Sequence, residues 1–233
     1  MKQNITVFKG FSPKLLEFLK NLKQNNNKVW FDAHKEDYEN YMKKPSIALI
    51  QDMGNLFLDR NLPLVAEPKK SMFRIYRDIR FSSNKEPYKT NLGIYFPFGR
   101  AGIKPVFTCG FYFHFDTDES FVGGGIHLPE TNILKSIRKK IADDFEIFTK
   151  IITDKKLTKA YDNMFMGDSL KKVPQGYPTD HPAAEYLKMK EYTVGQAIKF
   201  EETYSAGLID LLFDKAAVLL PFLEFLDDAI KMA

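Results

Sequence analysis

The pattern of hydrophobic and polar residues divides the chain into three parts. Hydrophobic residues recur with helical spacing from about residue 10 to 60, alternate with polar residues from about 71 to 127, and return to helical spacing from about 129 to 233. No repeat, low-complexity linker or change of composition separates these parts, so we expect a single domain over residues 1–233. The pattern predicts an α+β fold in which a central antiparallel sheet has one face covered by N-terminal and C-terminal helices.

The N-terminal part predicts two amphipathic helices. The first should begin at Ser12 as its N-cap with Pro13 in the first helical position, and the second should begin after Asn27 as its N-cap. Pro45 should kink or divide the second helix, because proline removes a backbone donor and clashes with the preceding turn. The helical region is expected to end near residue 60.

Alternation with a period of two predicts the strands of the central part. On the first predicted strand, residues 73–81, one face should hold Phe73, Ile75, Ile79 and Phe81, and the other Arg74, Tyr76, Asp78 and Arg80. Arg77 breaks this alternation and should point to the apolar side unless a bulge redirects it. Further strands are predicted at residues 92–98 and 108–116, joined by a hairpin loop at 99–102, and a strand or tight turn at 121–127.

The C-terminal part predicts helices around one more strand. A helix after Pro129 should place Ile133, Ile137 and Ile141 inward and a basic face outward, made of Lys135, Arg138, Lys139 and Lys140. We expect a helix at residues 144–152, loops at 153–182, a short helix at 185–190 and a strand at 192–198. From about residue 206 the pattern predicts a helical pair broken by Pro221.

Composition narrows the class of protein. The 34 basic and 30 acidic residues nearly balance, so a basic function would have to arise from local clustering. The single cysteine, Cys109, excludes an intrachain disulfide and favours a reducing compartment, for which the cytoplasm is the simplest expectation. Because no apolar segment has the length of a signal peptide or of a membrane-spanning helix, we expect a soluble protein without a membrane partner.

Cations and aromatic residues are concentrated between residues 73 and 90. Together with the polar face of the 108–116 strand they form the predicted ligand-binding set: Arg74, Arg77, Arg80, Lys85, Tyr88, Lys89, Tyr112 and His114. Arginine offers paired donors to carboxylates and phosphates, and tyrosine and histidine can orient a ligand or exchange protons. The favoured hypothesis is therefore a pocket for a small anionic or phosphorylated ligand, in a binding protein or an enzyme.

Two alternatives stay open for this set. It could be an interaction module for nucleic acid or an acidic protein, although a net charge of +4 supports nucleic acid only weakly. It could equally be a structural network of ion pairs, for which Arg77 and Asp78 are typical neighbours. The sequence does not predict an oligomeric state.

Known catalytic and cofactor motifs are absent from the sequence, so no catalytic residue and no cofactor are predicted. His114, Asp116 and His127 carry side chains suited to metals, but without a metal-binding motif we expect no metal. The glycines at 123–125 lack the spacing of a nucleotide-binding loop and are read as close backbone packing or a bulge. His181 is expected to cap or pack within a rigid loop.

Four phrases of the sequence resemble the DUF2461 family of bacterial and fungal proteins: WFDAHKEDYE, FRIYRDIRFSSNKEPYKTN, GGGIHLP and VPQGYPTDHPAAEYLKMK. The resemblance covers roughly residues 10–220. It implies a soluble single-domain protein and no particular activity. The positions that match its motifs are Arg77, Asp78, Arg80, Phe81, Lys85, Pro87, Tyr88, Lys89, Gly124, Gly125, Pro129, Gly176, His181 and Pro182.

Overall fold

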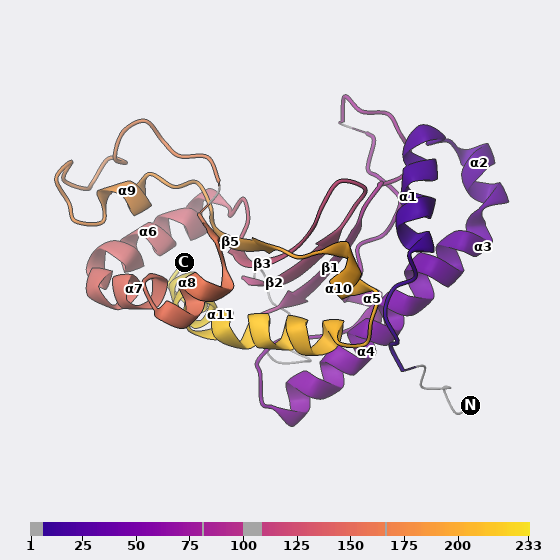
Figure 1. Ribbon diagram of the computed structural model, residues 1–233. Helices are drawn as coiled ribbons and strands as arrows, with labels where there is room; N and C mark the ends of the chain where they lie inside the picture. The colour runs from indigo at the N-terminus through magenta and orange to yellow at the C-terminus, as the bar shows by residue number, and fades with distance from the viewer. Residues whose placement is uncertain (1–6, 81, 100–108, 166) are drawn as a thin grey trace. The chain divides into compact units, whose positions relative to one another are not determined.

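The computed structural model describes residues 7–80, 82–99, 109–165 and 167–233 (Figure 1). Its N-terminal part contains α1 (Lys14–Gln24), α2 (Lys28–Ala33), α3 (Lys35–Asp37), the π-helical η1 (Tyr38–Lys43), α4 (Lys44–Asp59) and α5 (Pro68–Ser71). Three strands follow: β1 (Leu92–Pro97), β2 (Gly110–Phe115) and β3 (Ser120–Ile126). The remaining elements are α6 (Thr131–Asp143), α7 (Phe145–Ile152), α8 (Lys155–Ala160), β4 (Asn163–Met164), α9 (Ala184–Leu187), β5 (Tyr192–Ala197), α10 (Phe200–Thr203) and α11 (Leu208–Lys231).

The strands form an antiparallel sheet in the order β1-β2-β3-β5-β4. The short β4 pairs with β5, so that Asn163 lies opposite Gly195 and Met164 opposite Val194. Helices lie at both ends of the chain, and the α+β class predicted from the hydrophobic pattern is therefore confirmed. The strands predicted at 92–98, 108–116, 121–127 and 192–198 are all present with small differences in their ends, although Thr108 lies outside the described residues.

The chain divides into two compact units, each built from three separate segments. The first unit comprises Met1–Phe96, Tyr112–Val122 and Ala197–Phe213. Aromatic rings fill its core: Phe11 stacks on Phe113 at a centroid distance of 6.0 Å, Phe57 of α4 meets Phe96 edge-on at 5.3 Å, and Phe200 meets Phe115 at 5.2 Å. Helices and their flanking loops thus cover the apolar side of β1 and β2 within this unit, because that face must be buried.

The second unit comprises Pro97–Phe111, Gly123–Gln196 and Asp214–Ala233. Its glycines allow β3 to lie unusually close to its neighbours. A Cβ atom on Gly124 would lie 2.3 Å from Leu219 of α11, and one on Gly125, which has a φ of 121°, would lie 2.0 Å from the Tyr192 carbonyl oxygen. Close backbone packing therefore explains the glycine run, as the sequence suggested.

The largest error in the sequence prediction is the strand at 73–81. The chain there is irregular, and among the described residues its backbone pairs with neighbouring segments at the isolated bridges Met72–Ile94 and Tyr76–Tyr88 rather than in a ladder. Of its predicted apolar face, Ile75 is buried, whereas Phe73 is 42% and Ile79 36% exposed, and Phe81 lies outside the described residues. Alternating hydrophobic residues indicate a strand only where another element packs on their face, whereas most of the hydrophobic side chains described in this segment are exposed.

Helix boundaries near the N-terminus lie close to the predicted signals, but α1 begins one residue later than predicted, at Lys14 with Pro13 and not Ser12 as its N-cap. Asn27 caps α2 by accepting a hydrogen bond from the Trp30 amide, and the Ser12 hydroxyl accepts one from the amide of Lys14, where α1 begins. Pro45 lies in the first turn of α4, directly after the π-helical η1. The backbone is helical at Lys43 and Lys44 on both sides of the junction, so what accompanies the proline is a change from π-helix to α-helix and not a break.

Three predictions in the C-terminal part are wrong. Pro221 lies inside a single continuous helix, α11 (Figure 1), whose neighbouring residues Phe222 and Leu223 are fully buried, and this packing outweighs the lost helical hydrogen bond. Arg138 is not on the outer face of α6: it is 8% exposed and donates to the Met189 carbonyl oxygen at 2.8 Å. The loop-rich stretch also contains α8 and β4, which the pattern did not indicate.

Two predictions stay untested. The hairpin loop at 99–102 lies mostly outside the described residues, because only Gly99 is placed. Whether the two units make up one domain remains a prediction. Every helix in the described part of the chain is too short or too polar to cross a membrane.

Candidate functional site

Three of the predicted ligand-binding cations influence one another. Lys89 places its ammonium group 5.1 Å from the centre of the exposed Phe73 ring. Partial burial lowers the pKa of Lys89, and the positive charges of Arg74 and Arg77 lower it further. Among the described residues, neither Arg74 nor Lys89 has a carboxylate within ion-pair distance. We call Arg74, Arg77 and Lys89 the cation cluster.

Arg77 is the half-buried member of the cation cluster. Its side chain is 28% exposed, and its terminal nitrogen lies 3.8 Å from Glu86 and 3.5 Å from the Tyr88 carbonyl oxygen, which are both long contacts. Its Nε atom is buried and has no hydrogen-bond partner among the residues that the structure describes. The residue that breaks the predicted alternation, Arg77, therefore has a guanidinium group whose hydrogen-bond donors are only partly paired within the described residues.

Arg80 and Lys85 differ from the cation cluster because the chain supplies their partners. Arg80 binds Asp78 through two hydrogen bonds, at 3.0 Å and 2.7 Å, and these bonds lower the pKa of the Asp78 carboxyl group. Lys85 donates to the Ile79 carbonyl oxygen at 3.0 Å. The predicted basic set thus separates into a cluster with few internal partners and two residues engaged in the turn.

Tyr88 belongs to the core of the first unit. It is 3% exposed, stacks on Phe31 at 4.1 Å, and burial raises the pKa of its hydroxyl group. The Asn26 side chain accepts from the Tyr88 amide at 3.1 Å and donates to its carbonyl oxygen at 3.0 Å. The sequence pattern assigned a role to the neighbouring Asn27, as a helix cap, and nothing in it reveals that Asn26 contacts a residue 62 positions away.

Tyr112 and His114 form a second group on the outer face of β2. The Tyr112 hydroxyl lies 3.0 Å from Nδ1 of His114, and Nε2 of His114 lies 3.2 Å from Oδ2 of Asp116. Burial raises the pKa of Tyr112 to about 12, so its hydroxyl stays protonated at neutral pH. Phe73 joins this group to the cation cluster, because its ring lies 5.9 Å from that of Tyr112.

Asp116 opens the turn between β2 and β3. Its Oδ1 atom accepts hydrogen bonds from the amides of Asp118 and Glu119, at 2.7 Å and 2.9 Å. Burial alone would raise the pKa of Asp116, but these bonds and the one to His114 outweigh it and lower the pKa. In the described residues, donor atoms of His114, Asp116 and Glu119 all lie within 4.8 Å of one another, whereas His127 pairs with Glu191.

Comparison with models of protein families shows to which family this chain belongs. A family model described as "Conserved hypothetical protein (DUF2461)" matches residues 14–225, which is most of the sequence. The chain belongs to the DUF2461 family. Neither the curated proteins nor the solved structures include a match to it.

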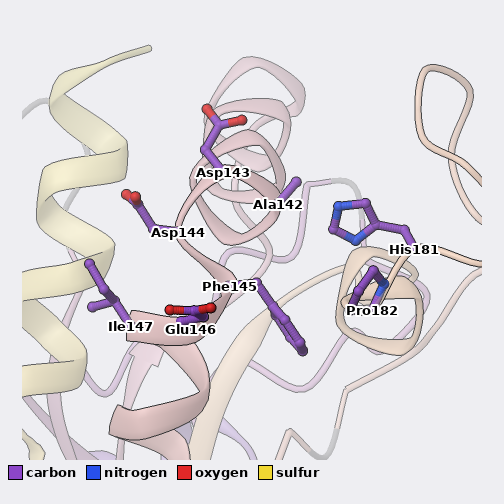
Figure 2. A pocket seen from close by; sticks show the side chains of 8 residues that line it. All are labelled: Ala142, Asp143, Asp144, Phe145, Glu146, Ile147, His181 and Pro182. Atoms are coloured by element: carbon purple, nitrogen blue, oxygen red, sulfur yellow. The ribbon is translucent and has the colours of Figure 1, made fainter.

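The second unit of this DUF2461 chain contains a pocket of about 410 Å³ where α6 gives way to α7 (Figure 2). Figure 2 shows His181 and Pro182 reaching it from a separate loop, with the His181 ring directed toward Ala142. Nδ1 of His181 accepts a hydrogen bond from the Ala183 amide at 3.0 Å, in the loop just before α9, whose N-cap Ala183 has no side-chain cap. The pocket has an acidic rim that includes Glu146, and none of the predicted ligand-binding residues lines it.

Proposed function

We propose that this DUF2461 protein binds a small anionic or phosphorylated ligand at Arg74, Arg77 and Lys89, with Tyr112 and His114 orienting it. The observation that supports the proposal is Arg77, whose buried Nε atom has no hydrogen-bond partner in the described part of the chain and which lies near a lysine of lowered pKa, Lys89. Burying a cationic donor without a partner is costly, and a bound anion would offset that cost. The three positive charges of the cation cluster also favour an anion, because each one adds to the electrostatic attraction between the cluster and the anion.

The remaining members of the predicted set have supporting roles in this proposal. Arg80 and Lys85 hold the turn between residues 78 and 86 through Asp78 and the Ile79 carbonyl oxygen. Tyr88 anchors the segment to Phe31. We therefore assign these three residues the structural role that was the alternative to ligand binding. The other five residues of the predicted ligand-binding set are assigned to the ligand.

A direct test uses the full chain with inorganic phosphate, pyrophosphate, sulfate and citrate as probes. The variant Arg74→Gln, Lys89→Gln removes two charges from the cation cluster, and the matched control Arg80→Gln, Lys85→Gln removes two charges from the same segment outside it. At a probe concentration of about 100 times Kd, the wild type should gain about 2.7 kcal/mol of stability. The gain should vanish in the first variant and persist in the control.

Two results would contradict the proposal. One is that none of the probes stabilises the wild type. The other is that both double variants lose the stabilisation equally, because that would indicate diffuse attraction to net charge and not a defined site.

One observation favours a second candidate function, binding of single-stranded nucleic acid. Phe73 and Tyr76 are 42% and 55% exposed next to the cation cluster, and exposed aromatic rings beside cations are typical of surfaces on which bases stack. Fluorescence titration of a labelled oligonucleotide should then show affinity that falls linearly with the logarithm of salt concentration. Affinity unchanged by Phe73→Ala and Tyr76→Ala would exclude this candidate.

We also propose a cytoplasmic location for the protein. The support is Cys109, which is fully buried and whose thiol pKa is raised by burial. A buried, protonated thiol is not readily oxidised and cannot reach another thiol to form a disulfide. Fluorescence microscopy of a tagged chain in its own host would test the location.

A further inference from the structure

We propose that His114, Asp116 and Glu119 form a binding site for a divalent metal ion of the Zn²⁺ or Mn²⁺ type. Each residue contributes one donor atom, and these atoms lie within 4.8 Å of one another at the end of β2 and in the turn that follows. The site lies within the first unit and shares His114 and Tyr112 with the anion site proposed above. Its test uses Zn²⁺ without any anionic probe, so that its failure and the failure of the proposed function can be told apart. The sequence predicted no metal because it contains no metal-binding motif, and Glu119 was not among the residues considered, since it falls in a turn and shares no strand or helix spacing with the other two.

The closest pair of donor atoms already has the separation that a common ion requires. Nε2 of His114 and Oδ2 of Asp116 are 3.2 Å apart. Donors bound to one ion at about 2.1 Å, with an angle between about 90° and 110°, are separated by about 3.0 to 3.4 Å. These two side chains would therefore need little movement to bind an ion.

The Asp116 carboxylate is oriented from outside the site. Its Oδ1 atom is occupied by the amides of Asp118 and Glu119, which leaves Oδ2 directed at His114. Metal-binding carboxylates commonly show this arrangement, in which hydrogen bonds to one oxygen fix the direction of the other. The same turn carries Glu119 to the edge of the site.

The His114 ring is held by contacts that the metal would not disturb. It is 8% exposed, stacks on Phe121 at 4.6 Å with an angle of 20°, and meets the Tyr112 hydroxyl at Nδ1. A hydroxyl group both donates and accepts, so Tyr112 can stabilise either tautomer of His114. With an ion bound, Nδ1–H would donate to Tyr112 and Nε2 would bind the ion, which makes Tyr112 a positioning residue.

The local charges indicate the class of ion and provide a control. Lys23 neutralises Asp118 at 2.8 Å, whereas Glu119 has no cation within ion-pair distance among the residues that the structure places. An imidazole nitrogen with two carboxylates suits Zn²⁺ or Mn²⁺, while Ca²⁺ and Mg²⁺ prefer oxygen ligands alone. Asp118 and Glu119 are thus adjacent acidic residues of one turn that differ in their relation to the site.

Calorimetric titration of the full chain with Zn²⁺ tests the proposal. The wild type should bind one ion, and Glu119→Gln should weaken that binding by about tenfold or more, as should Tyr112→Phe. The matched control Asp118→Asn removes the same charge from the same turn and should change Kd less than about twofold.

The tautomer of His114, read from its ring ¹⁵N chemical shifts, gives a second measurement that needs no substitution. Before addition of Zn²⁺ the proton should lie on Nε2 and be shared with Asp116, and at saturation it should lie on Nδ1. Failure of the wild type to bind Zn²⁺, equal losses in Glu119→Gln and Asp118→Asn, or a proton retained on Nε2 at saturation would each overturn the proposal.

Discussion

Lys89 and Arg77 show how a cation behaves when a protein withdraws it from water without giving it a full partner. Lys89 has its pKa lowered by burial and by two neighbouring guanidinium groups, and the buried Nε atom of Arg77 has no hydrogen bond to any residue that the structure places. Both conditions cost free energy in the folded chain. Residues in this condition are more common at functional sites than elsewhere, although ion-pair networks can produce them too.

The lowered pKa of Lys89 predicts a pH dependence of anion binding. Sulfate is a suitable probe because its charge does not change in the alkaline range. Its affinity should fall as pH rises through the lowered pKa of Lys89, because only the protonated ammonium group attracts it, and calorimetric titrations between about pH 7 and 10 would follow the decline. In Lys89→Arg the charge persists, so a decline as steep as that of the wild type would contradict the assignment.

The same shift has a definite sign for stability. Because the pKa of Lys89 is lower in the folded than in the unfolded chain, the unfolded chain holds the proton more tightly between the two values, and stability should rise with pH in that window. Lys89→Met keeps the apolar stem over Phe73 and removes the charge. At pH 7 and without ligand, its melting temperature should therefore equal or exceed that of the wild type, whereas a lower value would show that the charge is stabilising.

Asn26 is the residue whose loss should loosen the ligand-binding segment most directly. Asn26→Ala leaves the amide and carbonyl groups of Tyr88 without their partner and should lower the free energy of unfolding by about 1 to 3 kcal/mol. Denaturant titration measures the change. The control Asn25→Ala removes a neighbouring side chain that donates to the Asn21 carbonyl oxygen at the end of α1, and an equally large loss there would contradict the role given to Asn26.

At the scale of single elements, the sequence predicted best where one face is fully covered. The alternation of Cys109, Phe111, Phe113 and Phe115 identified β2, and all four residues are 0% exposed. It failed at residues 73–81, where exposed Phe73 and Ile79 imitate a strand face. Periodicity cannot separate these cases, because it records which residues alternate and not whether anything packs on them.

The sequence predicted most residues of the candidate site, but not which of them lie together or which partners they have. The concentration of cations between residues 73 and 90 identified Arg74, Arg77 and Lys89, but it gave Arg80 the same weight, although Arg80 has Asp78 as its partner. Asn26 and Glu119 were missed, since each reaches its position through the turn of the backbone and not through a strand or helix period. Partners distant in sequence are the part of a site that a single sequence conceals.

Helix α11 provides a test of how packing overrides local preference. Pro221 is exposed and interrupts the hydrogen bonding of a helix whose inner face, including Phe222 and Leu226, is fully buried. Pro221→Ala should raise the free energy of unfolding by about 1 to 3 kcal/mol, because alanine restores the missing amide donor. Denaturant titration should show little change for the exposed control Glu224→Ala. Destabilisation by Pro221→Ala would mean that the helix needs a bend at this point.

At the scale of the whole molecule, the chain passes repeatedly between its two compact units. Each unit is assembled from three segments, so neither exists as a continuous stretch that could be excised. The family model likewise covers residues 14–225, which include parts of both units. Both facts agree with the single domain expected from the sequence, which remains to be tested.

Cooperative unfolding is the appropriate test of that expectation. Interleaved segments should make the two units unfold together, so that far-ultraviolet circular dichroism, Tyr and Trp fluorescence and calorimetry report one coincident transition. Calorimetric and van't Hoff enthalpies should agree. Two resolved transitions would instead show that the units are separate domains.

The isolated bridges that hold residues 72–89 have a consequence for the exchange of amide hydrogens with solvent. The amides of Phe73, Arg77 and Lys89 donate to single carbonyl groups outside any ladder, at 2.7 to 3.0 Å. Such protons should exchange through local opening, well before those of β2, which need more extensive unfolding. If the anion binds residues 72–89 only while their bridges are intact, a higher anion concentration should make opening of this segment rarer. Exchange of these three amides should then slow as the site fills, whereas exchange of the β2 amides should not change.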